Sequence, residues 1–164
     1  MTKIPADLRL RPARPSDVPA INQLIATWAE RKLMLPRTVN ELYEIFRDFI
    51  IVEAEPGGLV GCAALHVVTG AIAELKSLAV TESAQGHGLG RRLVETCCAG
   101  ARELGLERVF CLTYQVDFFA KQGFVKVDRS RLPEKVWGEC IRCHRFLDCD
   151  EVAMWRTCAP VVGG

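Results

Sequence analysis

Three glycines within five residues mark the stretch whose residue types are best suited to hold a ligand. The loop Gln85-Gly86-His87-Gly88-Leu89-Gly90 follows an apolar run, Ile72–Val80, and precedes apolar residues at helical spacing. That apolar stripe consists of Leu89, Leu93, Cys97, Ala101 and Leu104. Glycines let backbone N–H groups turn towards one point, and a helix N-terminus adds unpaired donors and partial positive charge. The pattern therefore predicts a strand, a phosphate-binding loop and a helix.

The residues after the glycines exclude two common classes of phosphate-binding loop. A nucleoside-triphosphate loop requires Lys and then Ser or Thr after its last glycine, and Arg91-Arg92 stand there instead. A dinucleotide fingerprint counted from Gly86 and Gly88 requires its third glycine at the position of Arg91. Both patterns are excluded. On these residues alone, a glycine-rich connection without a ligand remains the alternative.

Length and composition limit the class of protein. A chain of 164 residues predicts a single domain over 1–164 with a substantial core. Lys and Arg number 21 against 20 Asp and Glu, so the charge balance predicts neither a nucleic-acid nor a membrane partner. No apolar run approaches the roughly 20 residues of a membrane span, and the N-terminus lacks signal-peptide features. We therefore expect a cytoplasmic protein whose eight cysteines are reduced thiols, metal ligands or buried apolar residues.

The elements that must position the loop follow from apolar periodicity and turn signals. Strands are predicted at Leu8–Pro12, Phe49–Ala54, Leu59–Val68, Ile72–Val80, Arg108–Leu112 and Phe124–Val127. A helix capped by Ser16 and running through Lys32 is followed by a break at Leu33–Arg37 and a helix begun by the capping box Thr38-x-x-Glu41. A helical turn is expected at Phe118–Gln122. The order βααβββαβαβ predicts an α/β (α+β) fold with a mixed central sheet flanked by helices.

These features together resemble a known family. The element order, Gln85-x-x-Gly88-x-Gly90 after the fourth strand, and the Phe118–Phe124 segment resemble the GNAT N-acetyltransferases over residues 8 to 128. A narrower resemblance, to the short single-domain N-acetylglutamate synthases, extends to about Met154. It is carried by Leu33–Arg37, Gly61–His66, Ala73–Val80 and Val136-Trp137-x-x-Cys140-x-x-Cys143. The resemblance implies the acyl-CoA N-acyltransferase fold, with acetyl-CoA as co-substrate.

The resemblance also implies which residues bind acetyl-CoA. In that family the central strand lends backbone amides to the pantetheine arm and polarises the thioester carbonyl, and the matching residues are Leu78, Ala79 and Val80. The pyrophosphate loop corresponds to Gln85, Gly86, His87, Gly88, Leu89, Gly90 and Arg91. Near the end of the match, Phe118 and Phe119 are expected to line the same coenzyme site.

A glutamate early on the central strand serves as general base in some family members, and Glu74 matches it. Strand alternation is expected to place Glu74, Lys76, Leu78 and Val80 on one face. A carboxylate there can take a proton from an incoming ammonium group, directly or through water. The alternative is a strand-end charge paired with Lys76, a cation that would lower the pKa of Glu74 and weaken it as a base.

The general acid departs from the family pattern. Many members carry a tyrosine four residues before a late Gly-Phe pair, and Phe119 stands in that position here. Phenylalanine cannot donate a proton. Tyr114 is the nearest substitute, with a core aromatic as its alternative role. A thiolate leaving group whose thiol has a pKa of about 8.5 can also take its proton from water.

The C-terminal segment, about residues 132–158, holds Cys140, Cys143, His144 and Cys149. Three cysteines and one histidine supply the four ligands that zinc requires. A single Cys-x-x-Cys without a second pair is a weak signal for zinc, so we expect structural thiols and no metal.

The resemblance implies that the acceptor is an amine. The resemblance implies acetyl transfer to the α-amino group of an amino acid, L-glutamate above others, as the first step towards arginine. Arg37 in the interhelical break and Lys76 on the strand are expected to hold the two carboxylates. Acetylation of a peptide N-terminus or another small amine, and a non-catalytic acyl-CoA-binding module, remain alternatives. The expected partner is a small molecule, and assembly into a homodimer is left open.

Overall fold

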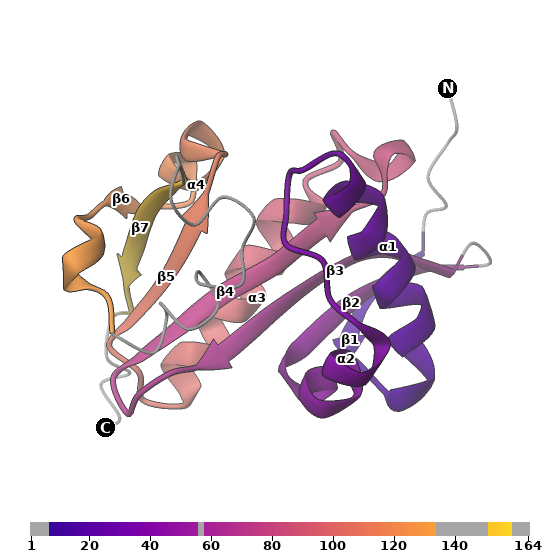
Figure 1. The fold of residues 1–164 in the computed structure, drawn as a ribbon, viewed down its shortest axis with the longest axis horizontal. Helices are drawn as coiled ribbons and strands as arrows, with labels where there is room; N and C mark the ends of the chain where they lie inside the picture. Colours follow the sequence, from indigo (N-terminus) through magenta and orange to yellow (C-terminus); the bar gives the residue numbers. More distant parts are fainter. Residues whose placement is uncertain (1–6, 56–57, 134–150, 159–164) are drawn as a thin grey trace. The chain divides into compact units, whose positions relative to one another are not determined.

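The protein is represented by a computed structural model that describes residues 7–55, 58–133 and 151–158. Its elements are β1 (Leu8–Pro12), α1 (Val18–Glu30), α2 (Val39–Ile45), β2 (Phe49–Ala54), β3 (Gly58–Val67), β4 (Ile72–Val80), α3 (Leu89–Glu103), β5 (Arg108–Thr113), α4 (Val116–Lys121), β6 (Val125–Lys126) and β7 (Val152–Thr157). The strands form a seven-stranded sheet in the order β1-β2-β3-β4-β5-β7-β6 (Figure 1). Antiparallel β1–β2 and parallel β4–β5 pairs make the sheet mixed, as predicted.

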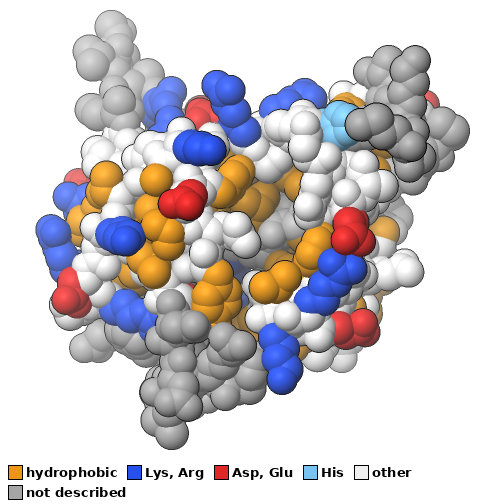
Figure 2. Space-filling model, turned by 90° about the horizontal axis from the view of Figure 1, so that it is seen from above, with side chains coloured by type: hydrophobic (Ala, Val, Ile, Leu, Met, Phe, Trp, Pro, Cys, Tyr) orange, Lys and Arg blue, Asp and Glu red, His pale blue; other side chains and the backbone are white. Residues whose placement is uncertain are grey.

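The chain divides into two compact units. The first unit comprises Met1–Leu65 with Ser77–Cys97, and the second comprises His66–Lys76 with Cys98–Gly164. Both β4 and α3 contribute residues to each unit. On the face drawn in Figure 2, basic and acidic side chains are interspersed, in keeping with the near balance of charge in the sequence. The expectation of one domain stays a prediction.

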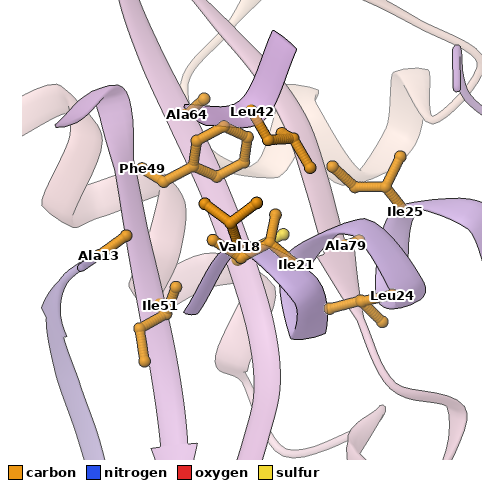
Figure 3. Close-up of a cluster of buried hydrophobic side chains, with 11 residues drawn as sticks. Ala13, Val18, Ile21, Leu24, Ile25, Leu42, Phe49, Ile51, Ala64 and Ala79 are labelled. Carbon is orange, nitrogen blue, oxygen red and sulfur yellow. The ribbon is translucent and has the colours of Figure 1, made fainter. Parts of the chain in front are cut away.

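In the first unit, a three-stranded antiparallel arrangement carries two helices on one face (Figure 1). The pairing of β2 with β3 shifts register between Val52 and Glu53, as at a β-bulge. The helices bury a contiguous apolar cluster against the strands (Figure 3). Its members are Ala13, Val18, Ile21, Leu24, Ile25, Leu42, Phe49, Ile51, Cys62, Ala64 and Ala79. Apolar residues at helical spacing on α1 therefore meet alternate residues of the strands, as the patterning predicts.

The opposite face of β3 receives α3. A Cβ placed on Gly61 would lie 3.4 Å from Leu93 of α3 and 3.4 Å from Val52 of β2. Gly61 is thus a point of close approach between helix and strand, where a Cβ would come into van der Waals contact with Leu93 and Val52. Alternation along β3 then explains why Cys62 faces α1 whereas Gly61 faces α3.

The beginning of α1 differs from the prediction. Ser16 lies in a 3-10 turn (Pro15–Asp17), and Asp17 is the N-cap residue, with no side-chain bond to the helix. Its carboxylate instead accepts from the Arg14 backbone N–H at 2.7 Å and pairs with Arg11 at 2.8 Å. Arg11 also contacts Glu53 at 3.2 Å. The helix ends at Glu30 rather than Lys32, because Lys32 has a φ of 60°, outside the helical region.

The start of α2 confirms the predicted capping box. The hydroxyl of Thr38 accepts from the Glu41 backbone N–H at 3.1 Å, and the Glu41 carboxylate accepts from the Thr38 N–H at 3.3 Å. Leu42 is fully buried, and Ile45 and Phe46 pack against the same cluster. The interhelical break predicted at Leu33–Arg37 is confirmed as well.

The buried stripe of α3 is confirmed except at its end. Leu89, Leu93, Cys97 and Ala101 are at most 2% exposed, whereas Leu104 is 64% exposed. Leu104 lies beyond Glu103, where the helix ends, and Gly105 follows with a φ of 78°. Leu104 still donates its backbone N–H to the Gly100 carbonyl at 3.1 Å, as in a helix, and its side chain is exposed there. The left-handed turn at Gly105 then brings Leu106 into the core instead.

The second unit contains a strand that the sequence patterning missed. Strand β7 lies between β5 and β6 and is antiparallel to both, with Trp155 opposite Phe110 and Val125. Ile72, Phe110, Leu132, Ala153 and Trp155 form the apolar cluster of this unit. The guanidinium groups of Arg108 and Arg131 lie 4.5 and 4.6 Å from the centre of the Trp155 ring. Helix α4 begins earlier than the predicted turn, and β6 is shorter than predicted.

Candidate functional site

The central strand β4 is interrupted at Ser77. Its φ of 54° lies in the left-handed region, which a non-glycine residue rarely adopts within a strand. One residue in this conformation breaks the alternation of side chains, as at a β-bulge. The prediction that Glu74, Lys76, Leu78 and Val80 share one face therefore fails at Ser77. Sequence periodicity missed it because serine carries no signal for this conformation.

The backbone after Ser77 is anchored from the surrounding elements of the first unit. Ala79 packs into the cluster under α1, so Leu78 and Val80 lie on the opposite face of the strand. The peptide that joins Val80 to Thr81 is held at both its polar atoms. The Val80 carbonyl accepts from the indole Nε1 of Trp28 at 3.2 Å, and the Thr81 N–H donates to the Val60 carbonyl at 2.9 Å.

The glycine loop adopts the geometry that its composition predicts. Gly86 and Gly88 have φ values of 83° and 75°, which L-residues avoid. A Cβ at either position would have nothing within 4 Å, so the need for glycine here is conformational rather than steric. Gln85, His87 and Arg91 are exposed, Gly90 is half-buried, and Leu89 is buried as the first residue of α3.

Glu74 lies on the part of β4 that belongs to the second unit. It is 9% exposed and opposite Phe110, in the register that pairs Ile72–Glu74 with Arg108–Phe110. Alternation places its side chain on the face of Ile72 and Phe110, beside the apolar cluster. Burial raises the pKa of the Cys111 thiol, and the Glu74 charge raises it further. Glu74 is thus a largely buried carboxyl group rather than a solvated strand-end charge.

The two aromatic candidates of the second unit have different surroundings. Phe119 is 5% exposed and contacts Phe118 and Phe124 edge to face, with centroids 5.0 and 5.2 Å apart. This packing shows a core role for Phe119, with the half-buried Phe118 beside it. Tyr114 is also half-buried and immediately follows β5.

The acceptor candidates belong to different units. Arg37 is half-buried in the connection between α1 and α2, and its backbone carbonyl accepts from the Asn22 side-chain amide at 2.8 Å. Lys76 is half-buried on β4 in the second unit. The sequence assigns Asn22 no role and places Trp28 only on the apolar face of α1. The bonding partners of both are remote along the chain, and no spacing rule links them to these residues.

The cysteine-rich tail yields no site in the described part of the chain. Cys140, Cys143, His144 and Cys149 lie outside the described residues, so the expectation of structural thiols without metal stays a prediction. Within 7–55, 58–133 and 151–158, no group of three or more His, Cys, Asp or Glu side chains is arranged to hold a metal ion. Nor does any helix in these ranges combine the length and hydrophobicity needed to cross a membrane.

Comparison with known proteins relates this chain to a protein family. Residues 20–124 match the acetyltransferase (GNAT) family. The amino-acid acetyltransferase of Mycobacterium tuberculosis is 38% identical over 161 residues, covering 93% of this chain and 92% of that protein. A structure from the same organism, in complex with CoA and NLQ, is 35% identical with a TM-score of 0.77, over 91% of this chain and 98% of that chain. The N-acetylglutamate synthase of Neisseria gonorrhoeae, complexed with coenzyme A and N-acetyl-glutamate, is 30% identical with a TM-score of 0.85, over 94% of this chain and 36% of that longer chain.

The chain belongs to the acetyltransferase (GNAT) family, and it has the fold of that family. It is an acetyltransferase enzyme that uses acetyl-CoA as co-substrate, as the sequence predicted. Its similarity to proteins named amino-acid acetyltransferase and to an N-acetylglutamate synthase also confirms the narrower resemblance.

Proposed function

We propose that this enzyme transfers the acetyl group of acetyl-CoA to the α-amino group of L-glutamate, in the cytoplasm, as the first step towards arginine. The observation that carries the proposal is similarity over nearly the whole chain to an amino-acid acetyltransferase. The likeness to a synthase complexed with N-acetyl-glutamate supports glutamate as the acceptor. Two local features support a coenzyme site. Gly86 and Gly88 adopt left-handed conformations just before α3, and Ser77 interrupts the strand β4.

The donor is held by backbone groups. The loop from Gln85 to Arg91 receives the pyrophosphate at the N-terminus of α3, where unpaired N–H groups and the helix dipole favour an anion. The backbone of Leu78, Ala79 and Val80 holds the pantetheine arm and polarises the thioester carbonyl. The left-handed residue Ser77 interrupts the regular strand just before this stretch, which supports its assignment to the ligand.

The reaction is a direct attack of the amine on the thioester. Glu74 takes a proton from the ammonium group, directly or through water, so that the nitrogen lone pair is available. The new C–N bond forms, the nitrogen releases its second proton to water, the C–S bond breaks, and coenzyme A leaves as a thiolate. Tyr114 supplies the proton to that thiolate, or water does so. Phe119 has no part in proton transfer, because it is a packed hydrocarbon ring.

The acceptor brings two carboxylates, and each must exchange water for a charged partner on entering the site. Arg37 and Lys76 are the cations we assign to them. The planar guanidinium of Arg37 matches a carboxylate in two-point geometry, and its backbone is fixed by Asn22. Arg37→Ala should therefore lower kcat/KM for glutamate by about 30-fold or more, equivalent to about 2 kcal/mol, and leave the KM for acetyl-CoA nearly unchanged.

Screening the amino acids for acetyl-CoA-dependent release of free thiol tests the proposal. Glutamate should give the highest kcat/KM, and Arg9→Ala, an exposed change on β1, should match the wild type. A preference for another amino acid would replace glutamate but keep the reaction class. Turnover only with peptide N-termini or other small amines would overturn the proposal. Coenzyme binding without turnover of any amino acid would overturn it as well.

A further inference from the structure

The C-terminal end of α1 is joined to the end of β4 by side chains. The Trp28 indole donates from Nε1 to the carbonyl of Val80 at 3.2 Å. The guanidinium of Arg31 lies 4.8 Å from the centre of the Trp28 ring. Arg31 also reaches Glu82, the first residue of a 3-10 turn (Glu82–Ala84), with 3.3 Å between Nη2 and Oε2. All four residues belong to the first unit.

Helical spacing explains the stacking. Trp28 and Arg31 are three residues apart, so their side chains lie on the same face of the helix end. The indole is thereby covered on one side by a cation and linked through it to the segment that leads into the glycine loop. The ion pair itself is exposed, at 47% for Arg31 and 73% for Glu82, so screening by water leaves it little strength. The indole N–H bond is the stronger part of the link.

The bond from Trp28 completes the fixation of one peptide group. That group carries the Val80 carbonyl at one end and the Thr81 N–H at the other. The carbonyl accepts from Trp28, and the N–H donates to the Val60 carbonyl on β3. Two bonds acting on opposite ends hold the plane of the peptide. Without the indole, only the pairing with β3 remains, and the peptide can tilt about it.

We propose that Trp28 is a positioning residue for acetyl-CoA, which sets the orientation of the last peptide of β4 and thereby the approach of the chain to the pyrophosphate loop. The proposal rests on the assignment of the pantetheine arm to Leu78–Val80 made above. Trp28 acts through the backbone of Val80 rather than through the reacting atoms. It fixes the peptide of the Val80 carbonyl, whereas the N–H groups assigned to the thioester carbonyl belong to the preceding peptides of β4. Its effect should therefore fall on coenzyme affinity rather than on kcat.

The test is CoA binding, measured by calorimetry for Trp28→Phe. Phenylalanine keeps an aromatic face for Arg31 and removes the N–H donor. Loss of one neutral hydrogen bond should raise the Kd for CoA by about 3- to 10-fold. The kcat with saturating acetyl-CoA and the KM for the acceptor should stay within about 2-fold of the wild type, because no contact to either is removed.

Trp155→Phe is the matched control. It makes the same chemical change in the second unit, also at an indole stacked with arginine, and it should leave CoA affinity unchanged. Arg31→Gln should raise the Kd less than Trp28→Phe does. Should Trp28→Phe fail to fold, a Trp28 analogue with sulfur in place of the N–H preserves the ring shape and removes only the donor.

A wild-type Kd for CoA in folded Trp28→Phe, or in the sulfur analogue, overturns the proposal. Equal losses in Trp28→Phe and Trp155→Phe also overturn it, because they would reflect general destabilisation. The measurement of CoA affinity is independent of the acceptor. An enzyme that binds CoA but does not acetylate glutamate would contradict the proposed function, and the Kd of Trp28→Phe would still decide the role of Trp28.

Discussion

The thiol of Cys62 donates a hydrogen bond to the backbone carbonyl of Ser77, with 3.4 Å between Sγ and O. Cys62 is fully buried on β3, and Ser77 is the left-handed residue that interrupts β4. The side chain of one strand thus satisfies a backbone acceptor that regular pairing of the next strand would otherwise engage. This contact gives the irregular conformation of Ser77 a side-chain partner on the neighbouring strand.

The conformation of Ser77 makes its substitution sensitive to the shape of the new side chain. Ser77→Gly should leave stability unchanged or raise it by up to about 1 kcal/mol, because glycine adopts this φ without strain. Ser77→Val should destabilise by more than about 1 kcal/mol, since a β-branched side chain is strained there. Urea unfolding measures both. Ser83→Val, at an exposed residue of the neighbouring turn, is the control, and equal effects of the two valine changes would refute the interpretation.

The buried thiols give stability a dependence on alkaline pH. Burial raises the pKa of Cys62 to about 12, against about 8.5 for a free thiol, although a hydrogen bond from the Ala79 backbone opposes the rise. Its contribution to stability is complete below about pH 8.5 and is lost as the pH rises towards 12, because the unfolded chain releases the proton first.

The free energy of unfolding should accordingly fall between pH 8.5 and 10.5, by up to about 1.4 kcal/mol per pH unit for each such thiol. Cys62→Ser removes the titrating group and keeps a donor for Ser77, so the slope should become shallower. Urea titrations at several pH values compare the two proteins. The same slope in both would show that the Cys62 thiol titrates normally in the folded state.

Gly88 is expected to be essential for coenzyme binding. Gly88→Val forces a β-branched residue to a φ of 75° in the loop and should abolish CoA binding while the fold survives. Calorimetric titration with CoA measures this. Gly58→Val imposes the same strain at a φ of 79° at the start of β3 and should leave CoA affinity unchanged. Unaltered affinity in Gly88→Val would remove the pyrophosphate-loop assignment.

Glu74→Gln tests the general base. The amide keeps the size of the side chain but cannot accept the ammonium proton, so kcat should fall by about 10²- to 10⁴-fold, most strongly at neutral pH. The affinity for acetyl-CoA should stay near that of the wild type. Glu107→Gln, an exposed change before β5, should have no effect on the pH–rate profile. A loss of only a few-fold with an unchanged profile would assign Glu74 a structural role.

The two leucines at the end of α3 should differ sharply in their contribution to stability. Leu104→Ala removes a side chain that is 64% exposed and should change the free energy of unfolding by less than about 0.5 kcal/mol. Leu106→Ala empties a site that is 6% exposed and should cost about 2–5 kcal/mol. Chemical denaturation at neutral pH compares them. Similar losses at both positions would mean that Leu104 is covered in solution.

Local signals made most of the fold predictable. The capping box of Thr38 and Glu41 lies within one turn of helix. The alternation of apolar residues in a strand and their spacing in a helix are likewise visible within a few residues of sequence. The predictions were wrong at helix ends, where residues outside the local pattern determine the conformation. Asp17, rather than Ser16, occupies the N-cap because Arg11 draws the chain into a 3-10 turn there. Leu104 fits the helical spacing but is exposed, and Leu106, beyond the left-handed turn at Gly105, is the leucine that is buried.

The candidate site was predictable to a similar extent. The glycine loop follows from composition, since Gly86 and Gly88 supply dihedrals that other residues avoid. The burial of Glu74 depends on pairing with β5, and the roles of Trp28, Asn22 and Cys62 depend on partners far along the chain. No periodicity links such pairs, so only the folded arrangement reveals them. Ser77 is the clearest case, because its left-handed conformation has no sequence signal at all.

The position of β7 has a consequence for the way the chain is made. Strand β7 separates β5 from β6 in the sheet, yet it is the last of these three strands to leave the ribosome. During translation the edge of β5 that will receive it presents unpaired backbone groups, and β6 has no strand to join. This part of the protein is therefore expected to complete its folding only after β7 has left the ribosome. Nascent chains that stall or terminate before Val152 would expose that edge to other chains and should depend on chaperones to remain in solution.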